Sequence, residues 1–236
     1  GYLRPDGRVG TRNYLAVIST VNCSASTSKY ICQSIPDTVL DEFPNVDGLL
    51  PITHKGGCGM QEDGPDHEQL NRVLSGFAMH PNIGGYILVG LGCEVGQASQ
   101  LIDSRNLIQI EGLNETHDRY SEHRPPTISI QDCGGVSATV RAGVDAVMEL
   151  LPSVNGVNRS PQPISQLMLG TQCGGSDGNS GVTANPAVGG ASDLLVGHGG
   201  TVILGETPEF YGAEHLLTRR AATREIGEKL IERIRW

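Results

Sequence analysis

The chain has 236 residues, enough for one large α/β domain or two small ones that bury a core without disulfides. Its formal net charge of −9 argues against nucleic acid and anionic membranes as partners, although a local basic pocket could still bind an acid. No apolar run approaches the ~20 residues that span a bilayer, and the first residues lack the pattern of a secretion signal. We therefore expect a cytoplasmic protein, whose six cysteines serve metal binding or catalysis more readily than disulfides.

Short runs rich in Val, Ile and Leu alternate with segments of helical periodicity. The runs are near-continuous, as in parallel strands, and lie at residues 14–19, 48–53, 86–91, 127–131, 167–170 and 201–204, with a weaker one at 107–110. Helical patterns cover residues 24–35, 66–79, 136–151, 186–196 and 214–236, the third stopped by Pro152. This alternation predicts an α/β fold, mostly parallel with helices on both faces, Rossmann-like, in one or two lobes.

A polar, proline-rich segment without periodicity separates the last two strands from the rest. We therefore expect a first α/β lobe at residues 1–151, a linker at 152–166 and a second α/β lobe at 167–236. The chain opens directly in a glycine turn and stops in a charged helix. These ends predict an excised piece of a longer protein.

Four of the six cysteines follow a predicted strand directly: Cys23, Cys58, Cys93 and Cys173. In a parallel sheet such positions share the carboxyl edge, where open α/β sheets bind their ligands. Similar turns could recur simply because βα units recur, but we favour a shared edge of thiols that forms a metal or redox site. Cys32 lies within a predicted helix and is expected in the core, and Cys133 could equally be a small buried hydrophobe.

The turns around these cysteines add other ligand types. His54 lies four residues before Cys58 in a glycine-rich turn, and imidazole with thiolate suits Zn or Fe better than Mg or Ca. A lone histidine is more often an ordinary loop residue, which is the competing interpretation. Lys55 could lower a thiol pKa or bind a carboxylate. The predicted metal ligands are Cys23, His54, Cys58, Cys93 and Cys173.

Two turns have the features of a site for an anionic substrate. Asn22 and Ser24 open a helix, where free N–H groups and the helix dipole attract anions, although Ser24 could also be a simple N-cap. The turn after Cys173 offers close backbone approach at Gly174, a donor at Ser176 and an orienting carboxylate at Asp177. No P-loop, dinucleotide fingerprint or nucleophile elbow is present, so nucleotide and serine-hydrolase chemistry are poorly supported.

Five segments together resemble the altronate/galactarate dehydratase family of hydro-lyases, which has the sulfolactate sulfo-lyase large subunit as a relative. They are GRVGTRNYLAVISTVNCSAS, THKGGCGM, HPNIGGYILVGLGCEV, CGGSDGNSGVTANPAVG and GETPEFYGAEHLLTRRA. The resemblance implies that this is the central catalytic region of a carbon–oxygen lyase that removes water from a sugar acid, giving a 2-keto-3-deoxy acid. It also implies a divalent metal, Fe²⁺ first, with Mn²⁺ or an iron–sulfur cluster as alternatives. Lys55 and Cys133 depart from the residues expected in the family.

This chemistry assigns roles to the residues at the predicted edge. A metal on the substrate carboxylate would stabilise the enediolate, while a base takes the α-proton and an acid protonates the leaving hydroxyl. The candidates for proton transfer are Glu94, Glu206, Lys55 and His215, the last of which could instead be a surface residue at a helix start. The expected partner is a small-molecule sugar acid, and a homo-oligomer is left open.

Three alternatives remain at this point. The leaving group could be sulfite from a sulfonated hydroxy acid rather than water. The chain could be a metal or iron–sulfur binding module without turnover. It could also fold without activity, because the resemblance implies a small N-terminal domain and a further C-terminal region, which would complete the second lobe, and both are absent.

Overall fold

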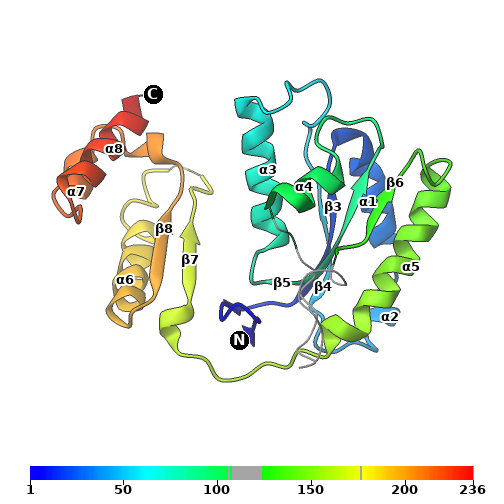
Figure 1. The fold of residues 1–236 in the computed structure, drawn as a ribbon. Helices are drawn as coiled ribbons and strands as arrows, with labels where there is room; N and C mark the ends of the chain where they lie inside the picture. Colours follow the sequence, from blue (N-terminus) through cyan, green and yellow to red (C-terminus); the bar gives the residue numbers. More distant parts are fainter. Residues whose placement is uncertain (106, 108–123, 176, 236) are drawn as a thin grey trace. The chain divides into compact units, whose positions relative to one another are not determined.

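The computed structural model describes residues 1–105, 107, 124–175 and 177–235. These residues form two compact units, residues 1–161 and 162–236, and each is described by itself (Figure 1). Within the described residues, no helix is both long and apolar enough to cross a bilayer. The weaker strand predicted at 107–110 falls, apart from Leu107, outside the described part of the chain.

The first unit is built on a four-stranded parallel sheet in the order β4-β3-β5-β6. Its strands are β3 (Tyr14–Ser19), β4 (Gly48–Ile52), β5 (Ile83–Gly90) and β6 (Thr127–Ser129). Strands β3 and β5 are central, and all eight positions of β5 are buried, which explains their near-continuous apolar sequences. A short antiparallel ribbon of β1 (Tyr2–Leu3) and β2 (Val9–Gly10) precedes the sheet. The predicted mostly parallel α/β architecture is confirmed.

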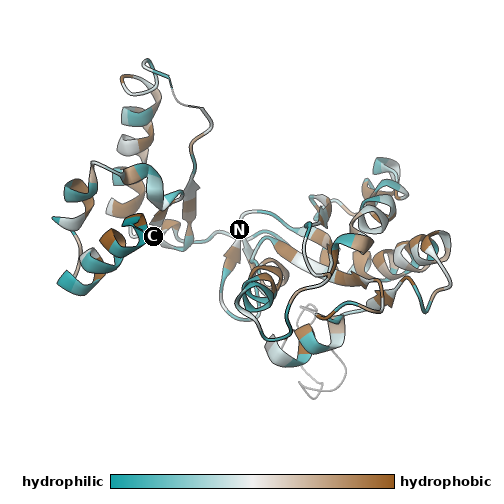
Figure 2. Ribbon diagram, turned by 90° about the horizontal axis from the view of Figure 1, so that it is seen from above, coloured by the Kyte–Doolittle hydropathy of each residue, from teal (hydrophilic) through white to brown (hydrophobic). Residues whose placement is uncertain are grey.

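Helices cover both faces of this sheet. On one face Leu15 and Val17 of β3 belong to a core with α1 (Ala25–Gln33) and α5 (Val136–Asn155). On the other face Ala16 and Ile18 belong to a core with α3 (Pro65–Ala78) and α4 (Ala98–Arg105). The helices of this unit carry hydrophobic and hydrophilic residues on different faces (Figure 2). Short helices η1 (Asn22–Ser24) and α2 (Asp37–Leu40) flank α1.

The second unit contains one parallel pair of strands, β7 (Met168–Thr171) and β8 (Thr201–Leu204), connected through α6 (Ala184–Gly197). Helix η2 (Ile164–Gln166) precedes β7, while η3 (Thr207–Phe210), α7 (Glu214–Thr218) and α8 (Arg224–Arg235) follow β8. Among the described residues of this unit, Leu195 is the only hydrophobic side chain that is buried. Its strands and α6 therefore expose apolar residues that a finished core would cover.

Two predicted helix boundaries are wrong. Helix α5 does not stop at Pro152 but continues to Asn155, because buried Leu151 and Val154 hold its last turn in the core despite the missing proline N–H. The single helix predicted over 214–236 is broken into α7 and α8. The break is stabilised locally, because the Thr223 hydroxyl oxygen accepts the Ile226 N–H at 3.3 Å and caps α8.

Candidate functional site

The carboxyl ends of β3 and β5 form the topological switch point of the first unit. The chain leaves β3 toward β4 on one side and leaves β5 toward β6 on the other, so neighbouring connections diverge there. Open α/β sheets bind ligands at such a point. The turns that follow the four parallel strands, at residues 20–24, 53–58, 91–94 and 130–133, lie at this one edge.

Hydrogen bonds join these turns to one another. The Asn22 N–H donates to the Gly56 carbonyl at 2.9 Å, which ties the turn after β3 to the turn after β4. On the other side, the Gln131 N–H donates to the Leu91 carbonyl at 3.0 Å. Gly57 packs closely on the first turn, because a Cβ there would lie 2.9 Å from the Thr20 carbonyl oxygen. The edge is therefore a connected layer of backbone.

Glu94 lies at the centre of this layer, with 7% of its surface exposed. One carboxylate oxygen accepts the Thr20 hydroxyl at 2.8 Å and the Leu91 N–H at 3.2 Å, and the other accepts the Gly92 N–H at 2.6 Å. Gly90 leaves the space for this carboxylate, since a Cβ there would overlap Glu94 Oε1. Glu94, predicted as a proton-transfer group, is thus positioned as the anchor of the β5 turn.

His54 is held by backbone at both ring nitrogens. Its Nδ1 accepts the Gly56 N–H at 3.1 Å, which leaves the ring proton on Nε2, 3.0 Å from the Ser19 carbonyl oxygen. Burial lowers the pKa of His54, opposed by its hydrogen bonds to the backbone. In this arrangement His54 is a neutral brace between the turns and offers no free nitrogen to a metal.

The strand-end cysteines lie at the predicted edge. Cys23, Cys58 and Cys93 are exposed, one in each of three turns, whereas Cys133 is half-buried. Cys32 is half-buried in α1 and packs against the core, and burial raises the pKa of its thiol to about 12. Within the described residues, no three His, Cys, Asp or Glu side chains come together as a possible metal site. Cys173 belongs to the second unit, so the metal site with all five predicted ligands stays a prediction.

The predicted anion site after β3 is only partly available. Asn22 is exposed, but Ser24 is fully buried and donates its hydroxyl to the carbonyls of Val21 and Val89 at 2.9 and 2.7 Å. Ser24 therefore stabilises the turn through these two hydrogen bonds, and its hydroxyl is not exposed to a ligand as the substrate-binding prediction requires. Lys55 is exposed beside the β4 turn, where it is available to an acidic ligand.

The sequence analysis missed His67 at this edge. It lies in the first turn of α3, buried, with Nδ1 accepting the Asp63 N–H at 3.1 Å and Nε2 3.2 Å from the Asn71 amide. A Cβ on Gly96 would lie 3.0 Å from its Nε2, so His67 also packs on the segment after Glu94. The sequence could have located His67, because the helix predicted after the Cys58 turn must begin at the same edge of the sheet, and His67 lies near its start.

The second unit has a carboxyl edge of its own. The Cys173 N–H donates to the Glu206 carboxylate at 2.9 Å, which joins the turns after β7 and β8. Glu206 adopts a left-handed backbone with φ of 58°, uncommon outside glycine. The Asp177 carboxylate accepts the N–H groups of Asn179 and Ser180, and Gly174 is exposed. Ser176 lies outside the described residues.

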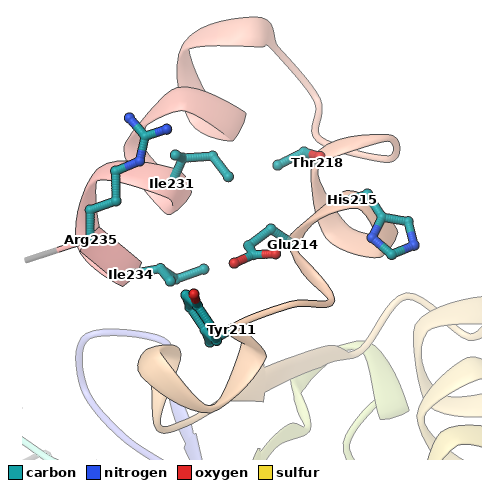
Figure 3. Close-up of a pocket in the computed structure, with 7 residues that line it drawn as sticks. All are labelled: Tyr211, Glu214, His215, Thr218, Ile231, Ile234 and Arg235. Atoms are coloured by element: carbon teal, nitrogen blue, oxygen red, sulfur yellow. The ribbon is translucent and has the colours of Figure 1, made fainter.

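His215 lines a cavity of about 500 Å³ between α7 and α8 (Figure 3). Glu214 points toward Tyr211 and Ile234, while the His215 ring points away from them (Figure 3). The Gly212 N–H donates to Glu214 and lowers the pKa of its carboxyl. The other lining residues are Thr218, Ile231 and Arg235.

Two models of known protein families match the chain. Residues 1–155 match the model described as D-galactarate dehydratase/altronate hydrolase, second domain. Residues 164–236 match D-galactarate/altronate dehydratase, C-terminal. The chain belongs to the D-galactarate/altronate dehydratase family. The resemblance seen in its motifs is confirmed, and the two matched regions meet close to the division between the two structural units.

Individual relatives agree with the family match. The chain is 37% identical over 241 residues to galactarate dehydratase (L-threo-forming) of Escherichia coli, with 100% of the chain and 44% of that protein covered. It is 33% identical over 234 residues to altronate dehydratase of Bacillus subtilis, with 99% and 44% covered. A third relative, (2R)-sulfolactate sulfo-lyase subunit beta of Chromohalobacter salexigens, is 29% identical over 229 residues, with 97% and 51% covered. The chain thus spans about half the length of these relatives.

Proposed function

We propose that the chain is part of a cytoplasmic hydro-lyase that dehydrates a sugar acid of the galactarate or altronate type. The observation that supports this most strongly is the match of two family models, which together cover nearly the whole chain. The relatives named galactarate dehydratase and altronate dehydratase supply the substrate class. The switch-point edge of the first unit supplies a place for the acid to bind.

The proposed reaction breaks a C–H bond next to the substrate carboxylate and a C–O bond at the neighbouring carbon. The carbon that loses the proton keeps the electron pair, which forms the enol double bond as the hydroxyl leaves with a proton as water. The enol then becomes a 2-keto-3-deoxy acid. Negative charge builds on the carboxylate during proton loss, so a fixed positive charge beside it lowers the barrier.

Lys55 is suited to that charge, because it is an exposed cation at the edge next to the backbone of the β3 and β4 turns. Asn22 adds an exposed amide donor for the same carboxylate or a hydroxyl. Glu94, with its three hydrogen bonds, would keep the β5 turn in place during the reaction. In the second unit, Glu206 and His215 stay candidates for proton transfer.

A metal is part of the proposal for the full-length enzyme, with Fe²⁺ first and Mn²⁺ or an iron–sulfur cluster as alternatives. Exposed Cys23, Cys58, Cys93 and Cys173 are the soft ligands that this chain could contribute, and the reaction above is written without a metal step. Metal analysis of full-length proteins in which one of these cysteines at a time is changed to serine tests whether the thiolates bind the metal. Unchanged metal content in all four variants would exclude thiolate ligation.

The test of function is turnover of galactarate and altronate by the full-length protein, followed as formation of the 2-keto acid. We expect Lys55→Gln to lower kcat/KM by about 10²-fold, because one charge that stabilises the transition state is lost. Lys29→Gln removes an equal charge from an exposed position on α1 and should retain wild-type turnover. Absence of 2-keto acid from both substrates would contradict the proposal.

A second candidate is elimination of sulfite, favoured by the match to sulfolactate sulfo-lyase subunit beta. The same edge would bind a sulfonated hydroxy acid, and sulfite would leave in place of water. Sulfite release from sulfolactate without dehydration of sugar acids would select this alternative. Dehydration without sulfite release would exclude it.

A further inference from the structure

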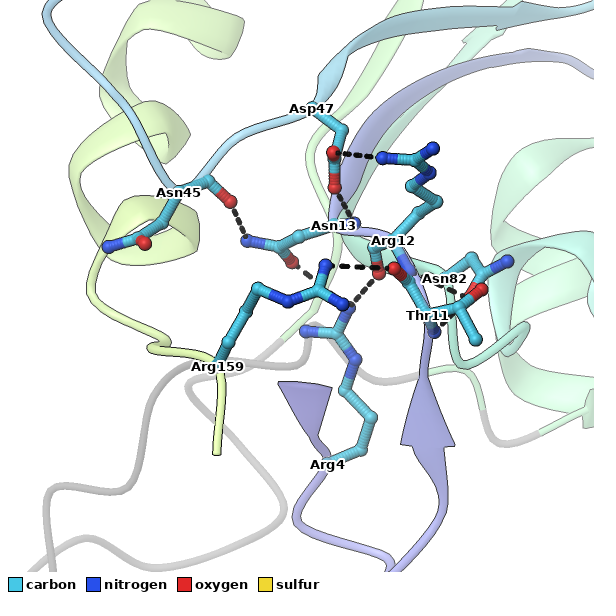
Figure 4. Close-up of polar contacts among 8 residues, drawn as sticks. All are labelled: Arg4, Thr11, Arg12, Asn13, Asn45, Asp47, Asn82 and Arg159. Atoms are coloured by element: carbon cyan, nitrogen blue, oxygen red, sulfur yellow. Dashed lines mark hydrogen bonds and ion pairs between the residues drawn. The ribbon is translucent and has the colours of Figure 1, made fainter. Parts of the chain in front are cut away.

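The amino edge of the first sheet, opposite the candidate site, gathers four arginines in a chain whose net charge is −9. Arg8 pairs with Asp6, and Arg12 pairs with Asp47 at 3.2 Å. Neither Arg4 nor Arg159 has a carboxylate partner within the part of the chain that the structure describes (Figure 4). Among the described residues, these two guanidinium groups therefore have no ion-pair partner, although the charge of Asp6 acts on Arg4.

Arg4 is the more unusual of the two, because only 2% of its surface is exposed. Its Nε donates to the Pro81 carbonyl at 2.7 Å, and its Nη2 donates to the Arg12 carbonyl and to Asn13 Oδ1 at 3.2 and 3.0 Å. Its Nη1 is buried and has no hydrogen-bond partner among the residues that the structure describes. A buried charged donor without an acceptor costs stability, and a carboxylate would remove that cost.

Arg159 reaches the same region from the segment after α5, while Arg4 comes from the end of the β1 ribbon (Figure 4). Arg159 is exposed and donates from Nη1 to the Thr11 carbonyl at 3.1 Å. The Cζ atoms of Arg4 and Arg159 lie 5.8 and 5.0 Å from the centre of the Tyr2 ring. Both planar guanidinium groups thus lie against the same ring, and each is of a type that can bind a carboxylate through two parallel N–H bonds.

We propose that Arg4 and Arg159 form a binding site for a small carboxylate, separate from the candidate dehydratase site. Arg159 is the entrance, because its exposed side chain can turn aside and close over the acid, which then accepts the unused N–H groups of Arg4 Nη1. Strand β5 has eight residues, so the two edges of the sheet lie about 26 Å apart. An acid bound at Arg4 is therefore not at the candidate active site.

Malonate is a suitable probe, since its two carboxylates can engage both arginines. Calorimetric titration of the full-length protein, at constant ionic strength kept with chloride, should show saturable binding. We expect Arg159→Gln to weaken this binding by about tenfold, the value of one charged hydrogen-bonded contact. Arg141→Gln removes the same charge from an exposed position on α5 and should leave the binding unchanged.

Arg4→Lys keeps the charge but removes the planar fork, so it should also weaken malonate binding, with circular dichroism as the check that the protein is folded. If Arg4→Lys does not fold, Arg159→Gln against Arg141→Gln decides by itself. Equal malonate affinity in the wild type and Arg159→Gln would overturn the proposal, as would an equal loss in Arg141→Gln. The readout is binding, so it is independent of whether the protein dehydrates sugar acids.

Discussion

Three side chains at the carboxyl edge of the first sheet stabilise the turns through hydrogen bonds to the backbone and to Thr20. His54 accepts one backbone N–H and faces one carbonyl, Ser24 donates to two carbonyls, and Glu94 accepts two N–H groups and a hydroxyl. The sequence had predicted His54 as a metal ligand, Ser24 as a substrate-binding residue and Glu94 as a proton-transfer group. Their partners lie up to 74 residues away in the chain, so the local sequence could not reveal them.

The bonding of His54 predicts a pH dependence of stability. Its pKa is lowered by burial from an ordinary value of 6.5, so below that pH the unfolded chain binds more protons than the folded one. The stability that neutral His54 contributes is fully present above about pH 6.5 and is lost as the pH falls through its folded pKa. Urea unfolding at pH 7.5 and 5.5 should show that the free energy of unfolding falls more at the lower pH in the wild type than in His54→Gln.

Gln can keep a donor near the Ser19 carbonyl but cannot titrate, which makes it the matched control for His54. The pKa of His80 is also lowered by burial, but His80 is present in both proteins and its effect cancels. If the free energy of unfolding falls equally in the two proteins between pH 7.5 and 5.5, His54 is not the source of the pH dependence.

At the scale of elements, the packing of neighbouring turns sets the geometry of the edge. Gly57 and Gly59 both have positive φ, 96° and 69°, so alanine strains the backbone at either position. Only at Gly57 would the new Cβ also meet other atoms, at 2.9 Å from the Thr20 carbonyl oxygen and 3.0 Å from Val21 Cα. At Gly59 nothing lies within 4 Å.

We therefore expect Gly57→Ala to lower the free energy of unfolding by about 1–3 kcal/mol more than Gly59→Ala, the usual cost of overpacking. Thermal or urea unfolding of the two variants measures this difference. Equal destabilisation would mean that the β3 and β4 turns are not in close contact at this point.

Element types were predicted well for the first unit and boundaries less well. Apolar runs and their spacing identified β3, β4, β5 and β6 as parallel strands, because strands buried on both faces have a recognisable sequence. The helix end predicted at Pro152 was wrong, because buried neighbours keep the last turn of α5 helical. The break between α7 and α8 was missed, because it depends on the Thr223 cap of α8. Tertiary contacts decided both.

At the scale of the whole molecule, the two units differ in how much core they have. The first unit has two apolar clusters, one on each face of its sheet. The second unit exposes apolar side chains on its strands and helices, including Met168, Leu194, Ile203 and Leu216. Such surfaces are normally covered in a stable protein.

We therefore expect a protein of residues 1–161 to fold by itself with a cooperative thermal transition. Residues 162–236 alone should bind the dye ANS strongly and lack a sharp transition, because their apolar residues face solvent. Circular dichroism and dye fluorescence of the two pieces measure this. A cooperative transition without dye binding in the second piece would contradict the expectation.

The sequence by itself determined the α/β class, the parallel strands, the strand-end position of four cysteines and the family, because buried strands and specific motifs are local signals. Only the tertiary structure decided what the residues at that edge do. Hydrogen-bond partners and burial depend on residues far apart in the chain, so the structure alone showed that His54, Ser24 and Glu94 brace the turns while Cys23, Cys58, Cys93 and Lys55 face solvent. The same dependence on distant partners leaves one nitrogen of Arg4, Nη1, buried at the opposite edge without an acceptor among the described residues.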